Sequence, residues 1–309
     1  MNAATGTGTV GAAAENNSRI LCTSPPFLGL RHTPTPIERH TMSEETRTEF
    51  DPSRYIFTDP GVPTAIRSRT VLPARRENFE VTTADGKRLV GELALPEGDI
   101  KATLVTFHPL PTHGGYMDSH VYKKASFRLP ALANIAVLRF NTRGTSSIRG
   151  TSDGVFDGGF AEKKDFDAIL DYVLDRALPN PWLIGWSFGT ELVLKYGPAR
   201  ANEFTGAVLL SPPLHRVHPA EMAEWNTISN PLYALIPEHD DYLQPAQARE
   251  RFSAINRAQV IPFEGCKHLW VGEKSVNAVL NSIASIVLGE QTVLPSEYSG
   301  PVAEEITEP

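Results

Sequence analysis

Short apolar runs recur along the chain from residue 78 onward, and turn signals and amphipathic segments separate them. Residues 78–83 and 88–95 alternate apolar and polar positions around Asp85-Gly86, a dipeptide typical of a hairpin turn. The later runs are apolar at almost every position, as in strands that are buried on both faces of a sheet. These predicted buried strands are residues 102–108, 135–141, 181–185, 204–211, 231–237 and 259–263.

Helical periodicity marks several of the segments between these strands. Residues 160–177 and 190–196 place apolar side chains three and four positions apart, and residues 275–288 predict a closing amphipathic helix. Strands that alternate with helices predict an α/β fold with a mostly parallel sheet covered on both faces. Because ligands of such sheets bind at the carboxyl ends of the strands, residues that directly follow a strand are the candidates for chemistry.

The two ends of the chain differ from this central region, which we expect to form one domain over residues 77–289. Residues 1–50 are rich in Ala, Gly, Thr, Asn and Pro without periodicity, and they predict a disordered tail. The segment that begins at Met42 looks like an ordinary protein start, so we expect Met42 to be the initiator. Residues 51–76 hold four prolines and predict an extended arm on the domain surface. Residues 290–309 hold five glutamates and no Lys or Arg, and they predict a disordered acidic tail.

Charge and cysteine content narrow the class of protein. The formal net charge is −7, and the five glutamates of the last twenty residues account for five of these seven charges. The remainder is nearly neutral, which argues against a nucleic-acid partner. Cys22 and Cys266 are too few for a disulfide framework. With no secretory signal and no apolar run of about 18 residues, the sequence predicts a cytoplasmic protein without a membrane partner, and it leaves the oligomeric state unknown.

The sequence Gly185-Trp186-Ser187-Phe188-Gly189 stands between a predicted strand and a predicted helix. In that context a G-x-S-x-G sequence holds its serine at the apex of a tight turn, where flanking glycines keep side chains from colliding. We therefore predict that Ser187 is a nucleophile. The alternative is a serine that only caps the following helix.

A serine hydroxyl becomes a useful nucleophile when a base removes its proton and a third group orients that base. His268 directly follows the last predicted strand and is a candidate base. Asp240 and Asp241 follow the strand over residues 231–237, and both are candidates for the third group.

Two longer motifs connect these residues to a family. Residues 108–117 have the pattern H-P-x-P-x-x-G-G-x-M, and residues 139–144 have the pattern R-F-N-x-R-G, with D-G-G at residues 157–159. Over roughly residues 76–290 the chain resembles a group of small, lidless bacterial hydrolases of the α/β-hydrolase superfamily. The resemblance implies a mostly parallel, doubly wound sheet of the α/β-hydrolase type without a large cap domain, and a Ser–Asp–His triad. It implies no substrate.

The same resemblance bears on the choice of acid. In this family the acid stands about five residues before a proline. Asp240 and Pro245 fit that setting. The resemblance therefore favours Asp240 over Asp241 as the triad acid.

A tetrahedral intermediate of acyl transfer needs backbone N–H donors for its oxyanion. One donor is expected from Phe188, the residue after the candidate nucleophile. The other is expected from the loop after residues 102–108. In that loop Leu110 stands between two prolines, which have no N–H, so it is the preferred donor. Residues 113–115 are a rival, but they lie several residues beyond the end of the strand.

No metal or cofactor is predicted. His108, His113 and His120 with Asp118 match no standard zinc spacing. The segment of residues 214–230 is too short for a lid domain, so we expect an open pocket. Three tryptophans are candidate substrate-binding walls, with core packing as the alternative for each: Trp186, Trp225 and Trp270.

An open apolar pocket beside a serine triad favours a small-molecule ester with a small or medium acyl chain. Peptidase or thioesterase activity would use the same residues. An acyltransferase and a non-catalytic binding protein on the same fold are the alternatives from other classes.

Overall fold

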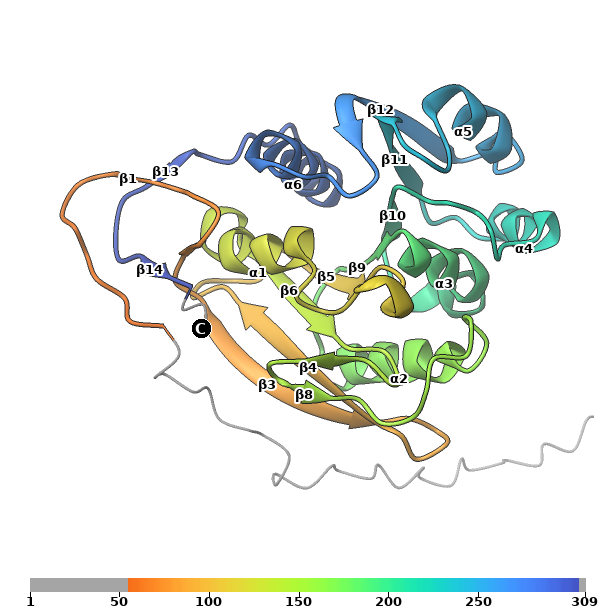
Figure 1. Ribbon diagram of the computed structural model, residues 1–309, viewed down its shortest axis with the longest axis horizontal. Coiled ribbons are helices and arrows are strands. Elements are labelled where there is room, and N and C mark those ends of the chain that lie inside the picture. Colours follow the sequence, from red (N-terminus) through yellow and green to blue (C-terminus); the bar gives the residue numbers. More distant parts are fainter. Residues whose placement is uncertain (1–54, 306–309) are drawn as a thin grey trace, which may run out of the picture. The chain divides into compact units, whose positions relative to one another are not determined.

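The structure is a computed structural model that describes residues 55–305 (Figure 1). The tail predicted over residues 1–50, which includes the expected initiator Met42, lies outside the described residues. So do residues 51–54 of the predicted arm and the last four residues of the chain.

One eight-stranded sheet forms the centre of the described region, in the order β12-β11-β10-β9-β5-β6-β4-β3 (Figure 1). Its strands are β3 Arg75–Thr82, β4 Arg88–Leu95, β5 Ala102–Phe107, β6 Ile135–Phe140, β9 Pro181–Trp186, β10 Gly206–Leu210, β11 Leu232–His239 and β12 Ala258–Lys267. β3 pairs antiparallel with β4, and β4 with β6, whereas every pair from β6 to β12 is parallel. The predicted hairpin and the mostly parallel sheet are therefore confirmed.

Helices cover both faces of this sheet (Figure 1). Their bounds are α1 His120–Ala133, α2 Glu162–Asp175, α3 Phe188–Tyr196, α4 Pro219–Ala223, α5 Pro245–Phe252 and α6 Glu273–Leu288. Most buried apolar side chains of α1 and those of α6 belong to one cluster, and those of α2 to α5 belong to another. Each cluster packs one face of the sheet, as expected for a doubly wound fold. None of the helices described is long and apolar enough to cross a membrane.

The hydrophobic pattern does not predict α1 or α5. Pro130 lies inside α1, where proline removes a backbone hydrogen bond, and eight other residues of that helix are buried. α5 is short and mostly polar, and it buries only Ala248 and Phe252.

The segment between β10 and β11 is short, as predicted. Residues 211–231 hold only α4 and a 3₁₀ turn over Glu224–Thr227. The described region therefore has no large cap over the ends of the strands.

The prediction of a disordered acidic tail is wrong for residues 290–305. β13 Glu297–Tyr298 pairs antiparallel with β1 Thr64–Ala65, and β14 Ala303–Glu304 pairs with β2 Thr70–Val71. Glu305 accepts a hydrogen bond from Lys123 Nζ at 2.7 Å. Strand pairing with the predicted arm and this ion pair outweigh the acidic composition of the segment.

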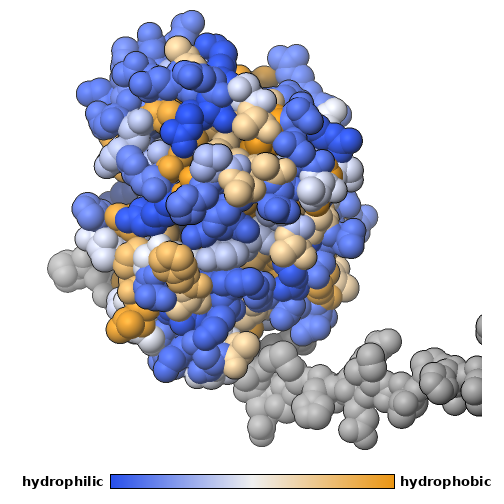
Figure 2. Space-filling view, turned by 90° about the vertical axis from the view of Figure 1, so that its right-hand side faces the viewer, coloured by the Kyte–Doolittle hydropathy of each residue, from blue (hydrophilic) through white to orange (hydrophobic). Residues whose placement is uncertain are grey.

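Figure 2 shows one face of the molecule, on which hydrophilic residues dominate and apolar residues lie scattered among them. Isolated apolar residues are ordinary on a protein surface and need no partner to explain them. This face therefore gives no candidate docking surface.

Candidate active site

Ser187 lies in a sharp turn between β9 and α3, with φ 51° and ψ −118°. Few residues other than glycine adopt a positive φ, and such strain is typical of functional sites. A Cβ on Gly185 would lie 2.6 Å from Thr190 Cα, and one on Gly189 would lie 1.9 Å from the carbonyl oxygen of Phe107. Glycine is therefore required at both positions, and the second close approach brings the start of α3 against the end of β5.

The structure brings the three predicted triad residues together from three strand ends. His268 Nε2 lies 2.9 Å from Ser187 Oγ, and His268 Nδ1 lies 2.9 Å from Asp240 Oδ2. Asp240 follows β11 and His268 follows β12. The side chains of Asp240 and His268 are buried, whereas Asp241 is exposed. The geometry thus favours Asp240 over Asp241 as the partner of His268.

The surroundings of Asp240 keep its carboxylate ionised. Burial, the largest single effect, raises its pKa, but the contacts with His268 and with two backbone N–H groups together outweigh burial. The backbone N–H groups of Tyr242 and Leu243, at 2.9 and 3.2 Å from Oδ1, also lower this pKa, which ends below its usual value. An ionised carboxylate accepts Nδ1–H of His268, so the lone pair of Nε2 faces the hydroxyl of Ser187.

Side chains of other elements donate hydrogen bonds to the backbone of the loop that carries His268. The carbonyl oxygen of His268 accepts hydrogen bonds from the Trp186 indole at 3.3 Å and the Ser211 hydroxyl at 3.0 Å. The next carbonyl, of Leu269, accepts one from His120 Nε2 at 2.7 Å. These three donors fix the backbone on which the imidazole stands.

The prediction that tryptophans form the walls of an open pocket needs correction. Trp186, Trp225 and Trp270 are all buried, at 2%, 1% and 0% exposure. Trp225 donates its indole N–H to the carbonyl oxygen of Leu194, and Trp270 packs edge-on against Phe263. Large aromatic side chains bury the most apolar area of any residue, and here core packing takes all three.

Tyr242 is the aromatic residue that stands beside the triad instead. Its side chain is 54% exposed, and its ring lies edge-on to the ring of His268, with 4.6 Å between the ring centroids. The ring of His215 lies 5.3 Å from that of Tyr242 on the solvent side. Leu269, next to His268 in the chain, is 53% exposed. No sequence pattern marked Tyr242, since its position follows from the turn after Asp240.

The two predicted oxyanion donors both have an available N–H. Phe188 is the first residue of α3, where the N–H has no intrahelical partner. Within residues 55–305, neither its N–H nor that of Leu110 makes a hydrogen bond. The N–H groups of His113 and Gly115 both donate to the carbonyl oxygen of Leu110, at 3.0 Å each. The rival donors of residues 113–115 are thus occupied in folding the loop back.

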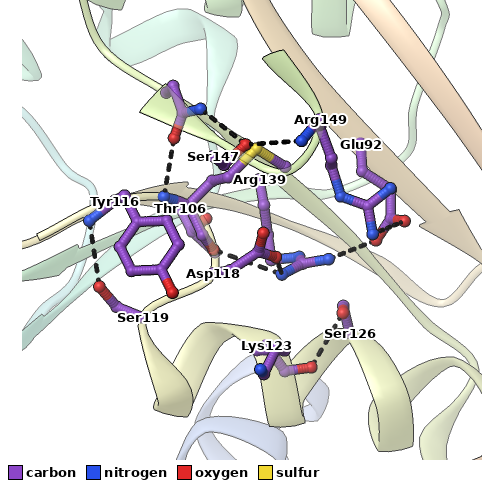
Figure 3. Close-up of polar contacts among 12 residues, drawn as sticks. Glu92, Thr106, Tyr116, Asp118, Ser119, Lys123, Ser126, Arg139, Ser147 and Arg149 are labelled. Atoms are coloured by element: carbon purple, nitrogen blue, oxygen red, sulfur yellow. Dashed lines mark hydrogen bonds and ion pairs between the residues drawn. The ribbon is translucent and has the colours of Figure 1, made fainter. Parts of the chain in front are cut away.

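Buried polar residues in β4, in β6 and directly after β6 anchor the other end of this loop (Figure 3). Asn141 Oδ1 accepts the N–H of Met117 at 3.0 Å, and Arg139 donates to the carbonyl oxygen of Met117 at 3.3 Å. The Arg139 guanidinium lies between the carboxylates of Asp118 and Glu92 and pairs with both. The R-F-N motif therefore supports the loop that presents Leu110.

Glu92 is the hub of this buried cluster. Its carboxylate also pairs with Arg76 at 3.5 Å and with Arg149 at 2.5 Å. Burial alone would raise the pKa of Glu92, but the guanidinium groups, that of Arg139 above all, lower it to about 2. The cluster is therefore held together by a fully ionised carboxylate.

Within residues 55–305, no group of three or more His, Cys, Asp or Glu side chains is placed to hold a metal ion. The histidines considered as ligands have other contacts, such as that of His120 with Leu269. Asp118 pairs with Arg139. The absence of a metal and of a cofactor from the activity stays a prediction.

Comparison with known proteins finds similarity in structure. No protein-family model matches the chain, and no curated protein matches it significantly. A lidless α/β serine hydrolase from Xanthomonas campestris is 24% identical over 71% of this chain and 96% of that chain, with a TM-score of 0.57. An esterase from Pyrococcus furiosus is 17% identical over 70% of this chain and 93% of that chain, also with a TM-score of 0.57.

A further structure of similar fold is that of Est1E from Butyrivibrio proteoclasticus with ferulic acid bound. It is 12% identical over 68% of this chain and 98% of that chain, with a TM-score of 0.56. At identities this low, the likeness carries information on the fold alone.

Proposed function

We propose that this chain, which has the α/β-hydrolase fold without a large cap, is a serine hydrolase that cleaves carboxylic esters of small or medium acyl chains. The observation that carries the proposal is the hydrogen-bonded series Ser187–His268–Asp240 at a strained strand-to-helix turn. Each member supplies what acyl transfer needs: a hydroxyl, a base within reach of its proton, and an anion that orients the base.

The proposed reaction starts when Ser187 Oγ attacks the ester carbonyl carbon and His268 Nε2 takes the hydroxyl proton. Asp240 stabilises the imidazolium that forms. The carbonyl oxygen becomes an oxyanion that accepts the N–H groups of Phe188 and Leu110. One such donor contributes about 10² to 10³ in rate. His268 then gives its proton to the leaving alcohol oxygen, and water hydrolyses the acyl ester of Ser187 by the reverse steps.

The proposed size class of the substrate rests on the surroundings of Ser187. Residues 211–231 are too few to cover the triad with a lid domain. The exposed side chains of Tyr242 and Leu269 next to the triad offer apolar contact for a short acyl or alcohol group. A cytoplasmic location stays a prediction from the cysteine content.

A substrate panel tests the proposal. It compares p-nitrophenyl acetate, butyrate and palmitate with a thioester and an anilide of butyrate, and it uses the Ser187→Ala variant as the control. We expect turnover of acetate and butyrate esters, with a smaller kcat/KM for palmitate, and no turnover by the variant. Binding of the esters without turnover would favour a binding protein. Transfer of the butyryl group to added alcohol, in preference to water, would favour an acyltransferase.

A further inference from the structure

His108 directly follows β5 and is 1% exposed, and its ring is hydrogen-bonded at both nitrogens. Nε2 lies 3.1 Å from the backbone N of Thr142 and 3.0 Å from Thr142 Oγ1. A backbone N–H can only donate, so Nε2 is the acceptor and carries no proton. In the neutral ring the proton is therefore on Nδ1, which lies 2.7 Å from the carbonyl oxygen of Pro109 and donates to it.

Burial keeps this imidazole neutral. It lowers the pKa of His108 to about 4, and the hydrogen bond to Pro109 offsets only part of that effect. A protonated ring would also turn an Nε2–H toward the N–H of Thr142, donor against donor. A single tautomer is thus present throughout the neutral pH range.

The acceptor of this bond belongs to the peptide unit that contains the N–H of Leu110. In a planar trans peptide the C=O of Pro109 and the N–H of Leu110 point in opposite directions. A donor fixed on the oxygen therefore sets the direction of the N–H. A bond accepted at the oxygen also polarises the N–H and strengthens it as a donor. The peptide after Leu110 is fixed as well, because its oxygen accepts from His113 and Gly115.

The same region lies against the turn that carries Ser187. A Cβ on Gly189 would be 1.9 Å from the oxygen of Phe107 and 3.0 Å from that of His108. The Pro109–Leu110 peptide, which the imidazole holds, thus directly follows the residues at the end of β5 that contact the start of α3.

We propose that His108 is a positioning residue that orients the Pro109–Leu110 peptide, so that the N–H of Leu110 serves as an oxyanion donor. This inference rests on the proposed function, because an oxyanion donor has a role only if acyl transfer occurs at Ser187. Thr142, within the R-F-N-x-R-G motif, holds the ring in the required tautomer.

Two variants of matched polarity test the inference. An Asn amide places its N–H near the position of Nδ1, and a Gln amide reaches the position of Nε2. His108→Asn retains a donor for Pro109, whereas His108→Gln retains only a partner for Thr142. We expect kcat for p-nitrophenyl butyrate to fall by about 10² to 10³ in the Gln variant, the cost of one oxyanion donor. The Asn variant should stay within about tenfold of wild type, and KM should change little in either.

Affinity for a trifluoromethyl ketone, which forms a tetrahedral adduct with a serine, should weaken in the Gln variant by the same factor as kcat/KM. Thermal unfolding of each variant gives its loss of stability. Equal activity in the Asn and Gln variants, or losses that follow stability alone, would overturn the inference.

Nitrogen-15 NMR of the unmodified protein gives a second readout that needs no variant. Between pH 5 and pH 8 we expect one His108 tautomer with a protonated Nδ1 and an unprotonated Nε2. The reverse tautomer would overturn the inference even where neither variant folds. Ser187→Ala separates the two claims. If that variant turns over the ester like wild type, the proposed function fails. If it is inactive while His108→Gln is fully active, only the role of His108 fails.

Discussion

Replacement of Asp240, the most buried residue of the triad, by Asn tests the proposed proton transfer. Oδ1 of Asp240 accepts the N–H groups of Tyr242 and Leu243, so an Asn must keep its oxygen there. Its NH₂ then takes the place of Oδ2, which lies 2.9 Å from His268 Nδ1. A donor at that point makes Nδ1 the acceptor and moves the imidazole proton to Nε2. The ring can then no longer take the proton of Ser187.

The size of the effect distinguishes this mechanism from a simple loss of one bond. The wrong tautomer in a serine triad lowers kcat by about 10⁴, which corresponds to about 5.4 kcal/mol at 1.36 kcal/mol per factor of ten. Loss of a hydrogen bond to a charged group would cost about 1.5 to 3 kcal/mol, or roughly 10- to 150-fold. We expect the larger value.

The assay is kcat for p-nitrophenyl butyrate, together with the rate at which a fluorophosphonate labels Ser187. Asp241→Asn is the matched control, because the same change falls on an exposed neighbour. We expect it to retain activity within about threefold, as for a surface charge. An Asp240→Asn variant within tenfold of wild type would refute the reasoning. So would an equal loss in the Asp241→Asn variant.

Three further changes test other parts of the structure. Glu92→Gln leaves buried guanidinium groups without their carboxylate and should lower the free energy of unfolding in urea by about 3 to 5 kcal/mol. The control Glu80→Gln, which breaks an exposed pair, should lower it by at most about 1 kcal/mol. Equal losses in the two variants would contradict this reasoning. Since the pKa of Glu92 is about 2 in the fold against 4.5 ordinarily, its contribution is complete above pH 4.5 and is lost as the pH falls toward 2. Gly189→Ala puts a Cβ 1.9 Å from the Phe107 oxygen and should lower kcat at least about tenfold, because it separates the turn that carries Ser187 from the loop that presents Leu110. An unchanged kcat would count against that packing. Tyr242→Ala removes the ring beside His268 and should raise KM for the butyrate ester about three- to tenfold, which corresponds to the free energy of one aromatic contact. A change confined to kcat would speak against a role in binding.

Local pattern predicts the central strands well because burial on both faces leaves a continuous apolar run. β5, β6 and β10 are buried at every position, and each was recognisable in the sequence. The pairing of β13 with β1 and of β14 with β2 was not recognisable. Two-residue strands carry no periodicity, and their partners lie more than 200 residues away in the chain.

The candidate site divides in the same way. Ser187, Asp240 and His268 each follow a predictable strand, so the order of the strands brings them to one edge of the sheet. The burial of Trp186 and the exposure of Tyr242 depend on packing between segments far apart in the chain. Such packing leaves no local signal, which is why the wrong aromatic residues were expected beside the triad.

Covalent labelling of Ser187 tests the central claim most directly. A fluorophosphonate probe is added to the full chain, the mass of the intact protein is measured, and the modified peptide is sequenced. The proposal predicts one adduct per chain, located on Ser187, with loss of ester hydrolysis in proportion to labelling and no adduct on the Ser187→Ala variant. Ester hydrolysis that persists in fully labelled protein, or that the Ser187→Ala variant retains, would contradict it.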